Sequence, residues 1–367
     1  MKKVLLVSNH GGGFYNFKKE LIDNLISAGT EVHFAVPYDG KVPMMVEKGA
    51  IYHEIKIDRR GMNPIKDFSL MLQLFDLNNR INPDVLVLHT IKPNIYGSIA
   101  ARVSKIPYIN NITGLGSALQ LNNYMARILR MLYRCSLSKS SAIFFENDAN
   151  LNYFSKYSIG NLQSYILVPG AGVNTDHYFP REKKLTDSKS LTLLFIGRIM
   201  REKGINEYFT AAQYFHKKYQ NIKFQVVGPC DEPEYENMLH DQSEAGVIEY
   251  LGISNDTRVE MSSADCIVLP SYHEGMSNVL LEGASMGLPL ITSDISGCKE
   301  AVEDGKNGFL CKSKSAESLI TAIEKFIQLS DERRREMGHY GRIKMIQEFE
   351  RTIVVRKYIE VIQNILS

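Results

Sequence analysis

Short apolar runs alternate with amphipathic stretches along the first half of the chain. Such runs predict strands of a parallel sheet that is covered on both faces, and apolar positions at helical spacing between them predict helices. The predicted strands cover residues 4–8, 32–36, 51–57, 85–88, 106–112, 142–145 and 165–168. The predicted helices cover residues 14–28, 43–48, 64–81, 95–104, 122–137 and 149–157.

The same alternation restarts after a polar and charged segment at residues 169–190. Further strands are predicted at 191–196, 224–227, 248–251, 266–269, 288–292 and 308–311. Further helices are predicted at 205–219, 233–244, 256–263, 316–328, 331–349 and 353–365, with one more beginning near 278. The pattern therefore predicts an α/β protein of two doubly wound Rossmann-like domains.

The domain boundaries follow from where this alternation stops and restarts. We place the first domain at residues 1–168, the linker at 169–190 and the second domain at 191–349. The terminal helix, 350–367, is expected to pack back on the first domain. Ligands of doubly wound sheets bind at the carboxyl ends of the strands, so we expect the two domains to face one another across a cleft that holds the ligand.

Composition narrows the class of protein. The 367 residues are 44% hydrophobic and 23% charged, as in globular proteins, and a net charge of +2 argues against nucleic-acid binding. The five cysteines form no CxxC pair, which indicates a reducing compartment. The apolar run near the N-terminus is short, and no run reaches the roughly 20 residues of a membrane span. We expect a cytoplasmic location.

The stretch from 271 to 293 contains the largest group of candidate binding residues. Glu274 follows a predicted strand, Gly275 turns the chain, and Glu282 lies one turn into the next helix. A helix N-terminus attracts phosphate, and carboxylates beside it can accept hydrogen bonds from sugar hydroxyls, so the stretch suits a sugar nucleotide. The residues expected to offer this N-terminus are Ser277, Asn278, Val279 and Leu280. The alternative is that both glutamates are solvated helix residues.

Two other strand ends carry candidate binding loops. Arg198 and Lys203 follow the first strand of the second domain and suit a diphosphate, the alternative being a solvated charged loop. Gly12 and Gly13 follow the first strand of the chain and leave N–H groups of the next helix open to a ligand, unless the loop is only a turn. No acidic residue ends the second predicted strand, so a dinucleotide cofactor is not expected.

Basic and titratable groups gather between Val85 and Phe145, a run without any acidic residue. His89 ends a strand, where a histidine can bind an acceptor or move a proton, although a lone histidine is often structural. The helix at 122–137 is basic enough for an anionic membrane surface, the alternative being an ordinary solvated face. Its arginines are Arg127, Arg130 and Arg134. The spacing of histidines and aspartates predicts no metal site.

Together these residues resemble the retaining family 4 glycosyltransferases, which have the GT-B fold. The resemblance spans the chain and is strongest in GRIMREKG (197–204) and in LPSYHEGMSNVLLEGASMGLPLI, where the two glutamates are eight positions apart. It implies that Glu274 contacts the donor sugar, Glu282 the ribose, and Arg198 and Lys203 the diphosphate. It further implies that Gly228 and Gly252 lie against the base and that Asn174 belongs to the interdomain signature.

More narrowly, the chain resembles bacterial enzymes that extend undecaprenyl-diphosphate-linked saccharides. The motif from His89 to Asn94, which includes Lys92, and the loop Gly114–Ser117 carry this resemblance. Many members have a histidine after the strand that ends at Ile112, where this chain has Thr113. The resemblance implies a polyprenyl-diphosphate-linked acceptor, with Lys92 and Asn94 on the acceptor side, and a UDP-sugar as donor rather than a cofactor.

These observations lead to one main hypothesis. We expect a metal-independent, retaining hexosyl- or N-acetylhexosaminyltransferase of O-antigen, capsule or N-glycan synthesis, peripheral on the inner face of the cell membrane. Arg198, Lys203, Glu274 and His89 are its expected catalytic residues. A nucleotide-sugar 2-epimerase of the same fold and a non-catalytic sugar-nucleotide-binding subunit are the alternatives, and the intact set of two cations and two glutamates argues against the second.

Overall fold

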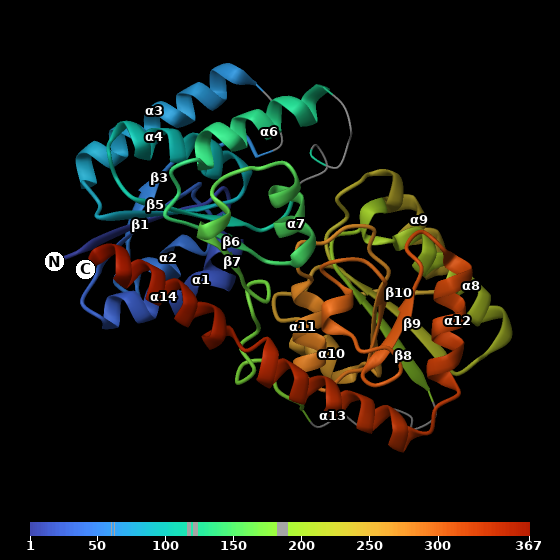
Figure 1. Ribbon diagram of the computed structural model, residues 1–367. Helices are drawn as coiled ribbons and strands as arrows, with labels where there is room; N and C mark the ends of the chain where they lie inside the picture. The colour runs from blue at the N-terminus through green and yellow to red at the C-terminus, as the bar shows by residue number, and fades with distance from the viewer. Residues whose placement is uncertain (60, 62, 116–118, 120–123, 182–189) are drawn as a thin grey trace. The chain divides into compact units, whose positions relative to one another are not determined.

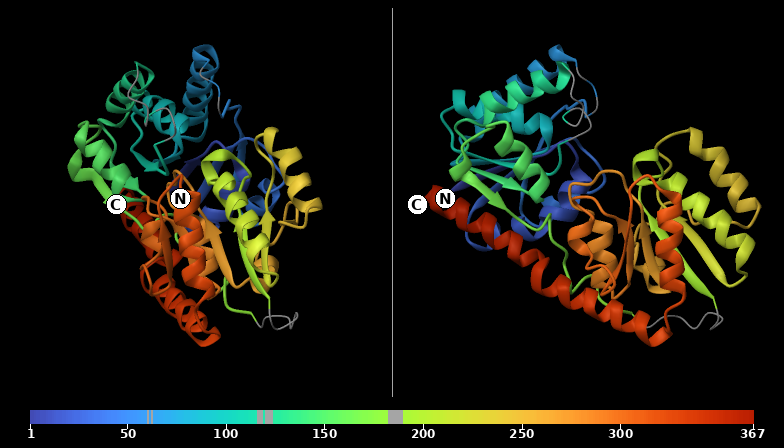
Figure 2. Two further views of the ribbon diagram at one scale, coloured as in Figure 1. Left: turned by 90° about the vertical axis from the view of Figure 1, so that its right-hand side faces the viewer. Right: turned by 45° about the vertical axis from the view of Figure 1, so that its right-hand side comes forward.

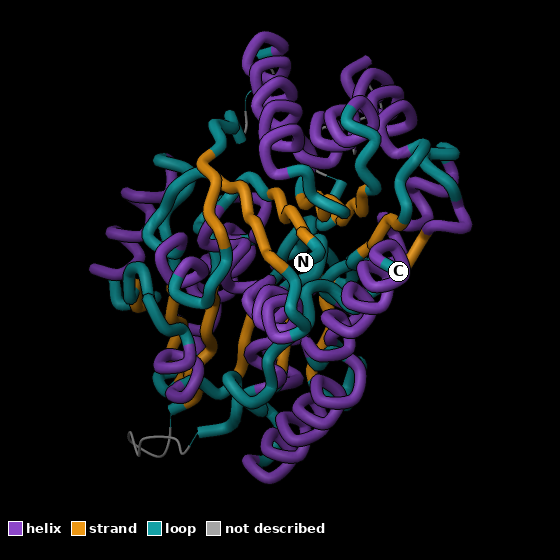
Figure 3. Tube along the Cα trace, turned by 90° about the vertical axis from the view of Figure 1, so that its left-hand side faces the viewer, coloured by secondary structure: helices purple, strands orange, loops and turns teal. Residues whose placement is uncertain are grey.

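The computed structural model of the chain describes residues 1–59, 61, 63–115, 119, 124–181 and 190–367 (Figure 1). These residues form two compact units, one of Met1–Ala171 with Thr352–Ser367 and the other of Gly172–Arg351. Each unit is built around a parallel sheet with helices on both of its faces (Figure 3).

The described part of the first unit contains a seven-stranded sheet in the order β3-β2-β1-β4-β5-β6-β7, with parallel pairing throughout. Its strands are β1 Lys3–Val7, β2 Glu31–Val36, β3 Ile51–Glu54, β4 Val85–His89, β5 Tyr108–Ile112, β6 Ala142–Phe145 and β7 Tyr165–Leu167. The order reverses at β1 and β4, which places their carboxyl ends at the switch point where ligands bind in such sheets.

The helices of the first unit cover both faces because apolar residues point alternately to either side of each strand. On β1, Val4 and Leu6 pack in one core and Leu5 and Val7 in another. The helices are α1 Gly11–Ser27, α2 Val42–Val46, α3 Pro64–Ile81, α4 Ser98–Val103, α6 Tyr124–Leu137, α7 Asp148–Lys156 and α14 Arg351–Leu366. Helices α1, α2 and α14 cover the face of Val4, and α3 and α4 cover the face of Leu5.

Helix α14 joins the first unit although it follows the second in sequence. Val354, Val355, Tyr358 and Ile362 are buried in the core that also holds α1. The Tyr358 ring stacks on Phe144 of β6, with ring centroids 4.0 Å apart. Apolar burial and this stacking therefore hold the helix on the sheet.

The described part of the second unit contains a six-stranded parallel sheet in the order β10-β9-β8-β11-β12-β13 (Figure 2). Its strands are β8 Leu191–Ile196, β9 Ile222–Val227, β10 Glu249–Tyr250, β11 Cys266–Leu269, β12 Leu290–Ser293 and β13 Gly308–Cys311. Its helices are α8 Ile205–Lys218, α9 Glu234–Glu244, α10 Arg258–Ser263, α11 Asn278–Ser285, α12 Ala316–Ile327 and α13 Asp331–Glu348. Helix α8 packs beside α12, and α11 packs beside α13.

The predicted fold class, two doubly wound parallel α/β domains, is confirmed. One local difference is the helix expected at 95–104, which is a π-helical turn at Pro93–Gly97 followed by α4. The turn is closed by Ser98, whose hydroxyl donates to the Asn94 carbonyl at 2.5 Å. Parts of three predicted segments lie outside the described residues, namely 116–117 of the loop after β5, 122–123 of the basic helix and 182–189 of the linker.

Candidate active site

The loop between β11 and α11 holds Glu274 in a defined orientation. Its Oε1 accepts a hydrogen bond from Ser271 Oγ at 2.8 Å and lies 2.5 Å from Lys203 Nζ. Both side chains of this ion pair are mostly buried, which strengthens the interaction relative to one in water. The structure therefore joins two predicted site residues, one from each of two neighbouring strand ends.

The N-terminus of α11 is open. Ser277 precedes the helix in an extended conformation, and its side chain does not cap it. The first hydrogen bond of the helix runs from the Leu281 N–H to the Ser277 carbonyl. The N–H groups of Asn278, Val279 and Leu280 come before it, so they have no acceptor within the helix. Ser277 is 3% exposed, and its Oγ and Asn278 Oδ1 have no partner among the described residues. This end of the helix suits an anion with neighbouring hydroxyls.

Glu282 lies one turn further into α11. The residue is only partly exposed. Burial raises the pKa of Glu282 to about 7, while a hydrogen bond with Tyr178 and the charge of Arg351 act in the opposite direction. Burial and Glu282 both raise the pKa of Tyr178, so its hydroxyl stays a donor. The carboxyl is therefore poised to change its charge near neutral pH.

The two predicted cations flank the turn from β8 to α8. Arg198 is half exposed and its Nη1 lies 2.8 Å from Asp231 Oδ2. Lys203 ends a short 3-10 turn, and Gly204 follows it at φ 75°. A Cβ at Gly204 would lie 2.0 Å from the Pro270 carbonyl oxygen, so only glycine lets α8 start this close to the loop that carries Glu274.

Glycines bring the ends of β8, β9 and β10 together. The Gly228 N–H donates to the Gly252 carbonyl at 2.8 Å, and Tyr250 donates to the Gly228 carbonyl at 2.9 Å. A Cβ at Gly228 would lie 1.9 Å from the Gly197 carbonyl oxygen, whereas no described atom comes within 4 Å of the corresponding point at Gly252. The backbone is therefore closely packed at Gly228 and leaves open space at Gly252. A flat ring such as a nucleotide base would fit in that space.

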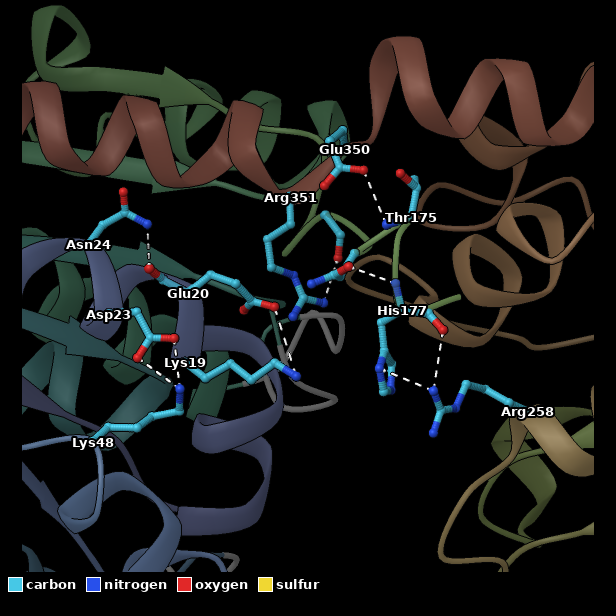
Figure 4. Close-up of polar contacts among 12 residues, drawn as sticks. Lys19, Glu20, Asp23, Asn24, Lys48, Thr175, His177, Arg258, Glu350 and Arg351 are labelled. Atoms are coloured by element: carbon cyan, nitrogen blue, oxygen red, sulfur yellow. Dashed lines mark hydrogen bonds and ion pairs between the residues drawn. The ribbon is translucent and has the colours of Figure 1, made fainter. Parts of the chain in front are cut away.

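Asn174 shapes the segment that enters the second unit. Its Oδ1 accepts from the His177 N–H at 2.8 Å. Figure 4 shows the neighbouring contacts, in which Thr175 donates to Glu350 at 3.1 Å and Arg258 donates to His177 at 3.2 Å. The amide of Asn174 thus has a structural bond, and its predicted contact with the donor stays a prediction.

The glycine loop of the first unit already holds an anion. The Gly12 N–H donates to Asp39 Oδ2 at 2.6 Å, and the Gly13 N–H donates to His10 Nδ1 at 2.8 Å. A Cβ at Gly11 would lie 2.6 Å from the same Asp39 carboxylate. The expectation that Gly12 and Gly13 offer open N–H groups is therefore corrected, because Asp39 and His10 accept hydrogen bonds from these two groups.

His89 ends β4 and is 3% exposed. Its Nδ1 faces the Asn111 amide nitrogen at 3.2 Å, and since that nitrogen only donates, Nε2 carries the ring proton. Nε2 has no partner among the residues that the structure describes. Burial lowers the pKa of His89 well below its ordinary value, and the charge of Lys18 adds to this. His89 is here a neutral N–H donor packed against Phe14, and its catalytic role stays a prediction.

The two predicted acceptor residues after β4 bind other parts of the first unit. Lys92 Nζ lies 2.5 Å from Asp67 Oδ1 of α3 in a largely buried ion pair. Asn94 is buried, donates to the Asn111 carbonyl at 2.8 Å and accepts from the Asn110 amide at 3.0 Å. Both polar side chains therefore have partners within the first unit, Lys92 on α3 and Asn94 on β5.

The arginines of α6 differ in their surroundings. Arg127 is exposed. Arg130 donates to the Tyr153 hydroxyl at 3.2 Å and lies 4.4 Å from the centroid of the Tyr157 ring, while Arg134 donates to the Tyr157 carbonyl at 2.6 Å. Two of the three are therefore partly engaged by α7 and the turn that follows it.

Sequence reasoning missed the partners of the predicted site residues. Asp39, Asp231, Ser271 and Tyr178 each contact one of them. For Asp39 a signal existed, because β2 pairs with β1 and Asp39 follows β2 by three residues. Ser271 lies three residues before Glu274 in the same loop, whereas Asp231 and Tyr178 are brought in by segments whose paths the sequence does not show.

Within the described ranges no three histidine, cysteine, aspartate or glutamate side chains are grouped as metal ligands would be. Among the helices that the structure describes, none is both long and apolar enough to cross a bilayer.

Two family models match the chain. Residues 3–147 match the model described as glycosyl transferase 4-like. Residues 179–344 match the model described as glycosyl transferases group 1. The second match includes both predicted cations and both glutamates.

Similar proteins match the full length or most of it. The N,N'-diacetylbacillosaminyl-diphospho-undecaprenol alpha-1,3-N-acetylgalactosaminyltransferase of Campylobacter jejuni is 26% identical, over 100% of this chain and 99% of the relative. The UDP-Gal:alpha-D-GlcNAc-diphosphoundecaprenol alpha-1,3-galactosyltransferase of Escherichia coli is 24% identical, over 72% and 71% of the two chains. The crystal structure of Anabaena Alr3699/HepE in complex with UDP and glucose is 17% identical with a TM-score of 0.81, over 99% and 100%. The last likeness concerns the fold alone.

Proposed function

We propose that this chain, which belongs to the glycosyltransferases of the GT-B fold, is a retaining enzyme that uses a UDP-sugar. The group transferred is a hexose or an N-acetylhexosamine, and the acceptor is a saccharide linked to a polyprenyl diphosphate. The product belongs to surface-glycan synthesis, and the names of the Campylobacter and Escherichia relatives give acceptors linked to a diphospho-undecaprenol.

One observation carries the proposal. Lys203 is ion-paired with Glu274 just before the open N-terminus of α11, Glu282 lies one turn into that helix, and Arg198 follows the carboxyl end of the neighbouring strand β8. A diphosphate fits the cations and the helix N–H groups, and sugar hydroxyls fit the carboxylates. A nucleotide sugar contains both kinds of group in one molecule.

The chemistry follows from these charges. Arg198, Lys203 and the N–H groups of α11 stabilise the negative charge that develops on the diphosphate as the glycosidic bond breaks. Lys203 Nζ forms an ion pair with Glu274 Oε1 at 2.5 Å. When the donor binds, its phosphate replaces this carboxylate as the partner of Lys203. The acceptor hydroxyl then attacks on the face that the diphosphate leaves, and the departing phosphate takes its proton. Because two side-chain cations balance the diphosphate, transfer needs no divalent metal.

Membrane contact through α6 is part of the proposal. Tyr124 and Met131 are exposed apolar residues on this helix, and the exposed Arg127 lies between them in sequence. Apolar side chains beside a cation suit the headgroup region of an anionic bilayer. Sedimentation with phosphatidylglycerol vesicles tests this, with weaker binding expected for Arg127→Glu, and equal binding of the variant would contradict it.

The donor test combines a screen with two substitutions. Among nucleotide sugars, the true donor should raise the melting temperature, because it binds only the folded chain. Arg198→Ala and Lys203→Ala should each lower turnover by about 100- to 1000-fold. Lys218→Ala, which removes another lysine of an ion pair at 2.8 Å in the same unit, is the matched control and should leave turnover unchanged.

Three results would overturn parts of this assignment. Near-normal turnover of Lys203→Ala would show that Lys203 does not stabilise the diphosphate. Loss of turnover in EDTA would contradict metal independence. Conversion of the donor without any acceptor would instead indicate a nucleotide-sugar epimerase.

A further inference from the structure

A buried tyrosine joins the loop of Glu274 to helix α8. The Tyr272 hydroxyl donates to both oxygens of the Glu207 carboxylate, at 2.8 and 2.9 Å. Tyr272 is 8% exposed and Glu207 is 9% exposed. A carboxylate that is this buried is stable only when it is hydrogen-bonded, and a hydroxyl bond to a charged oxygen is a strong one.

Two further contacts join the same segments. The Tyr272 N–H donates to the Glu202 carbonyl at 2.8 Å. Gly204 touches the Pro270 carbonyl so closely that a Cβ would lie 2.0 Å from its oxygen. The segment 202–207 is therefore bound to the loop at three points, and Lys203 lies within that segment.

We infer that Tyr272 and Glu207 are positioning residues that set the separation between Lys203 and Glu274. This inference rests on the proposed function, in which Lys203 binds the diphosphate and Glu274 the sugar. The ion pair between Lys203 and Glu274 itself holds these two side chains together. That ion pair is broken when the diphosphate arrives, so the backbone needs a restraint that the donor does not disturb, and the Tyr272–Glu207 pair supplies it.

The expected effect is on the rate. Misplacing a reacting group by about 1 Å can lower turnover by about a hundredfold. Tyr272→Phe, which removes only the hydroxyl, should lower kcat by about 10- to 100-fold and change the Kd for UDP by less than about threefold. Glu207→Gln, whose amide oxygen still accepts the hydroxyl, should keep most of the activity.

A double variant separates positioning from stability. Tyr272→Phe alone leaves the Glu207 carboxylate buried without its donor, which should lower the melting temperature. Tyr272→Phe with Glu207→Leu removes both polar partners and should recover the melting temperature. If the pair positions the site, kcat of the double variant stays low. Recovery of kcat together with the melting temperature would reduce the pair to a structural contact and overturn the inference.

The matched control lies on the same helix. Tyr214 of α8 also donates to a glutamate, Glu324, at 2.9 Å, but on the exposed surface. Tyr214→Phe should leave kcat unchanged, and a kcat of Tyr272→Phe as high as that of this control would contradict the inference. Wild-type turnover reports separately on the proposed function, so the two failures are distinguishable.

One readout needs no activity. The coupling between Lys203 and Glu274 is obtained from a double-mutant cycle on urea unfolding. In the Tyr272→Phe background this coupling should fall, because one of the three contacts that hold the two segments at their separation is lost. An unchanged coupling would overturn the inference even if no donor is found.

Discussion

Replacing Glu282 with glutamine should make the protein more stable in neutral and alkaline solution. Burial raises the pKa of Glu282 from its ordinary 4.5 to about 7. Between these two values the folded chain holds a proton that the unfolded chain has released, so the free energy of unfolding falls as pH rises. Each pH unit in this window is worth about 1.4 kcal/mol, which gives about 3 kcal/mol in total.

The Glu282→Gln variant has no proton to lose at this site. Below pH 4.5 it should match the wild type, because a protonated carboxyl and an amide both bond with the Tyr178 hydroxyl. Above pH 7 the variant should be more stable by about 3 kcal/mol at most. Urea unfolding followed by circular dichroism between pH 4 and pH 8.5 measures the difference, and other titrating groups cancel because both proteins share them.

Glu303→Gln is the control for the sign of this effect. Hydrogen bonds from Lys306 and Tyr340 lower the pKa of Glu303 to about 2. The stability that its ionised form contributes is complete above 4.5 and is lost as pH falls toward 2. Between pH 5.5 and 8.5 the difference between this variant and the wild type should therefore be constant. A constant difference for Glu282→Gln over the same range would refute the raised pKa.

Two further substitutions test other sites. Asp39→Ala removes the carboxylate from the N-terminus of α1 and should cost about 1 kcal/mol, as other lost helix caps do. Inorganic phosphate should then raise the melting temperature of this variant more than that of the wild type, and equal shifts would show that the site is not freed. Tyr358→Phe removes a buried hydroxyl that has no partner within the described part of the chain and keeps the stacking on Phe144. It should raise the free energy of unfolding by about 1 kcal/mol, and a lower urea midpoint would contradict this.

Under the proposed function, donor binding would change the charge balance at Glu282. Hydroxyl groups that donate to a carboxylate favour its ionised form, so a bound ribose would offset the burial that destabilises the ionised carboxylate in the free protein. Active sites commonly carry such local instability. The opposing demands on Glu282 come from the helix packing around it and from Tyr178, neither of which its position in the sequence reveals.

Several predicted residues were assigned correctly to strand ends, but their partners were not foreseen. The glycines after the first strand predict N–H groups open to a ligand at Gly12 and Gly13, yet Asp39 accepts from the Gly12 N–H and His10 accepts from the Gly13 N–H. The position of His89 at a strand end predicts either a role toward the acceptor or a structural histidine, and in the structure Phe14 of α1 and Tyr358 of α14 pack against its ring. In both cases the local pattern located the residue, and a segment distant in sequence determined its surroundings.

The amino-acid sequence alone determined the fold and one half of the candidate site. Apolar runs of β-period and helical stretches between them are local properties, and a parallel sheet covered on both faces is the arrangement that buries them. The spacing of Glu274 and Glu282 follows from one loop and one helix turn. Only the tertiary structure decided which polar side chains meet. Strand order and loop paths bring together three pairs, namely Lys203 with Glu274, Arg198 with Asp231, and Tyr272 with Glu207. Such pairings depend on contacts between segments far apart in the chain, and no local spacing encodes them.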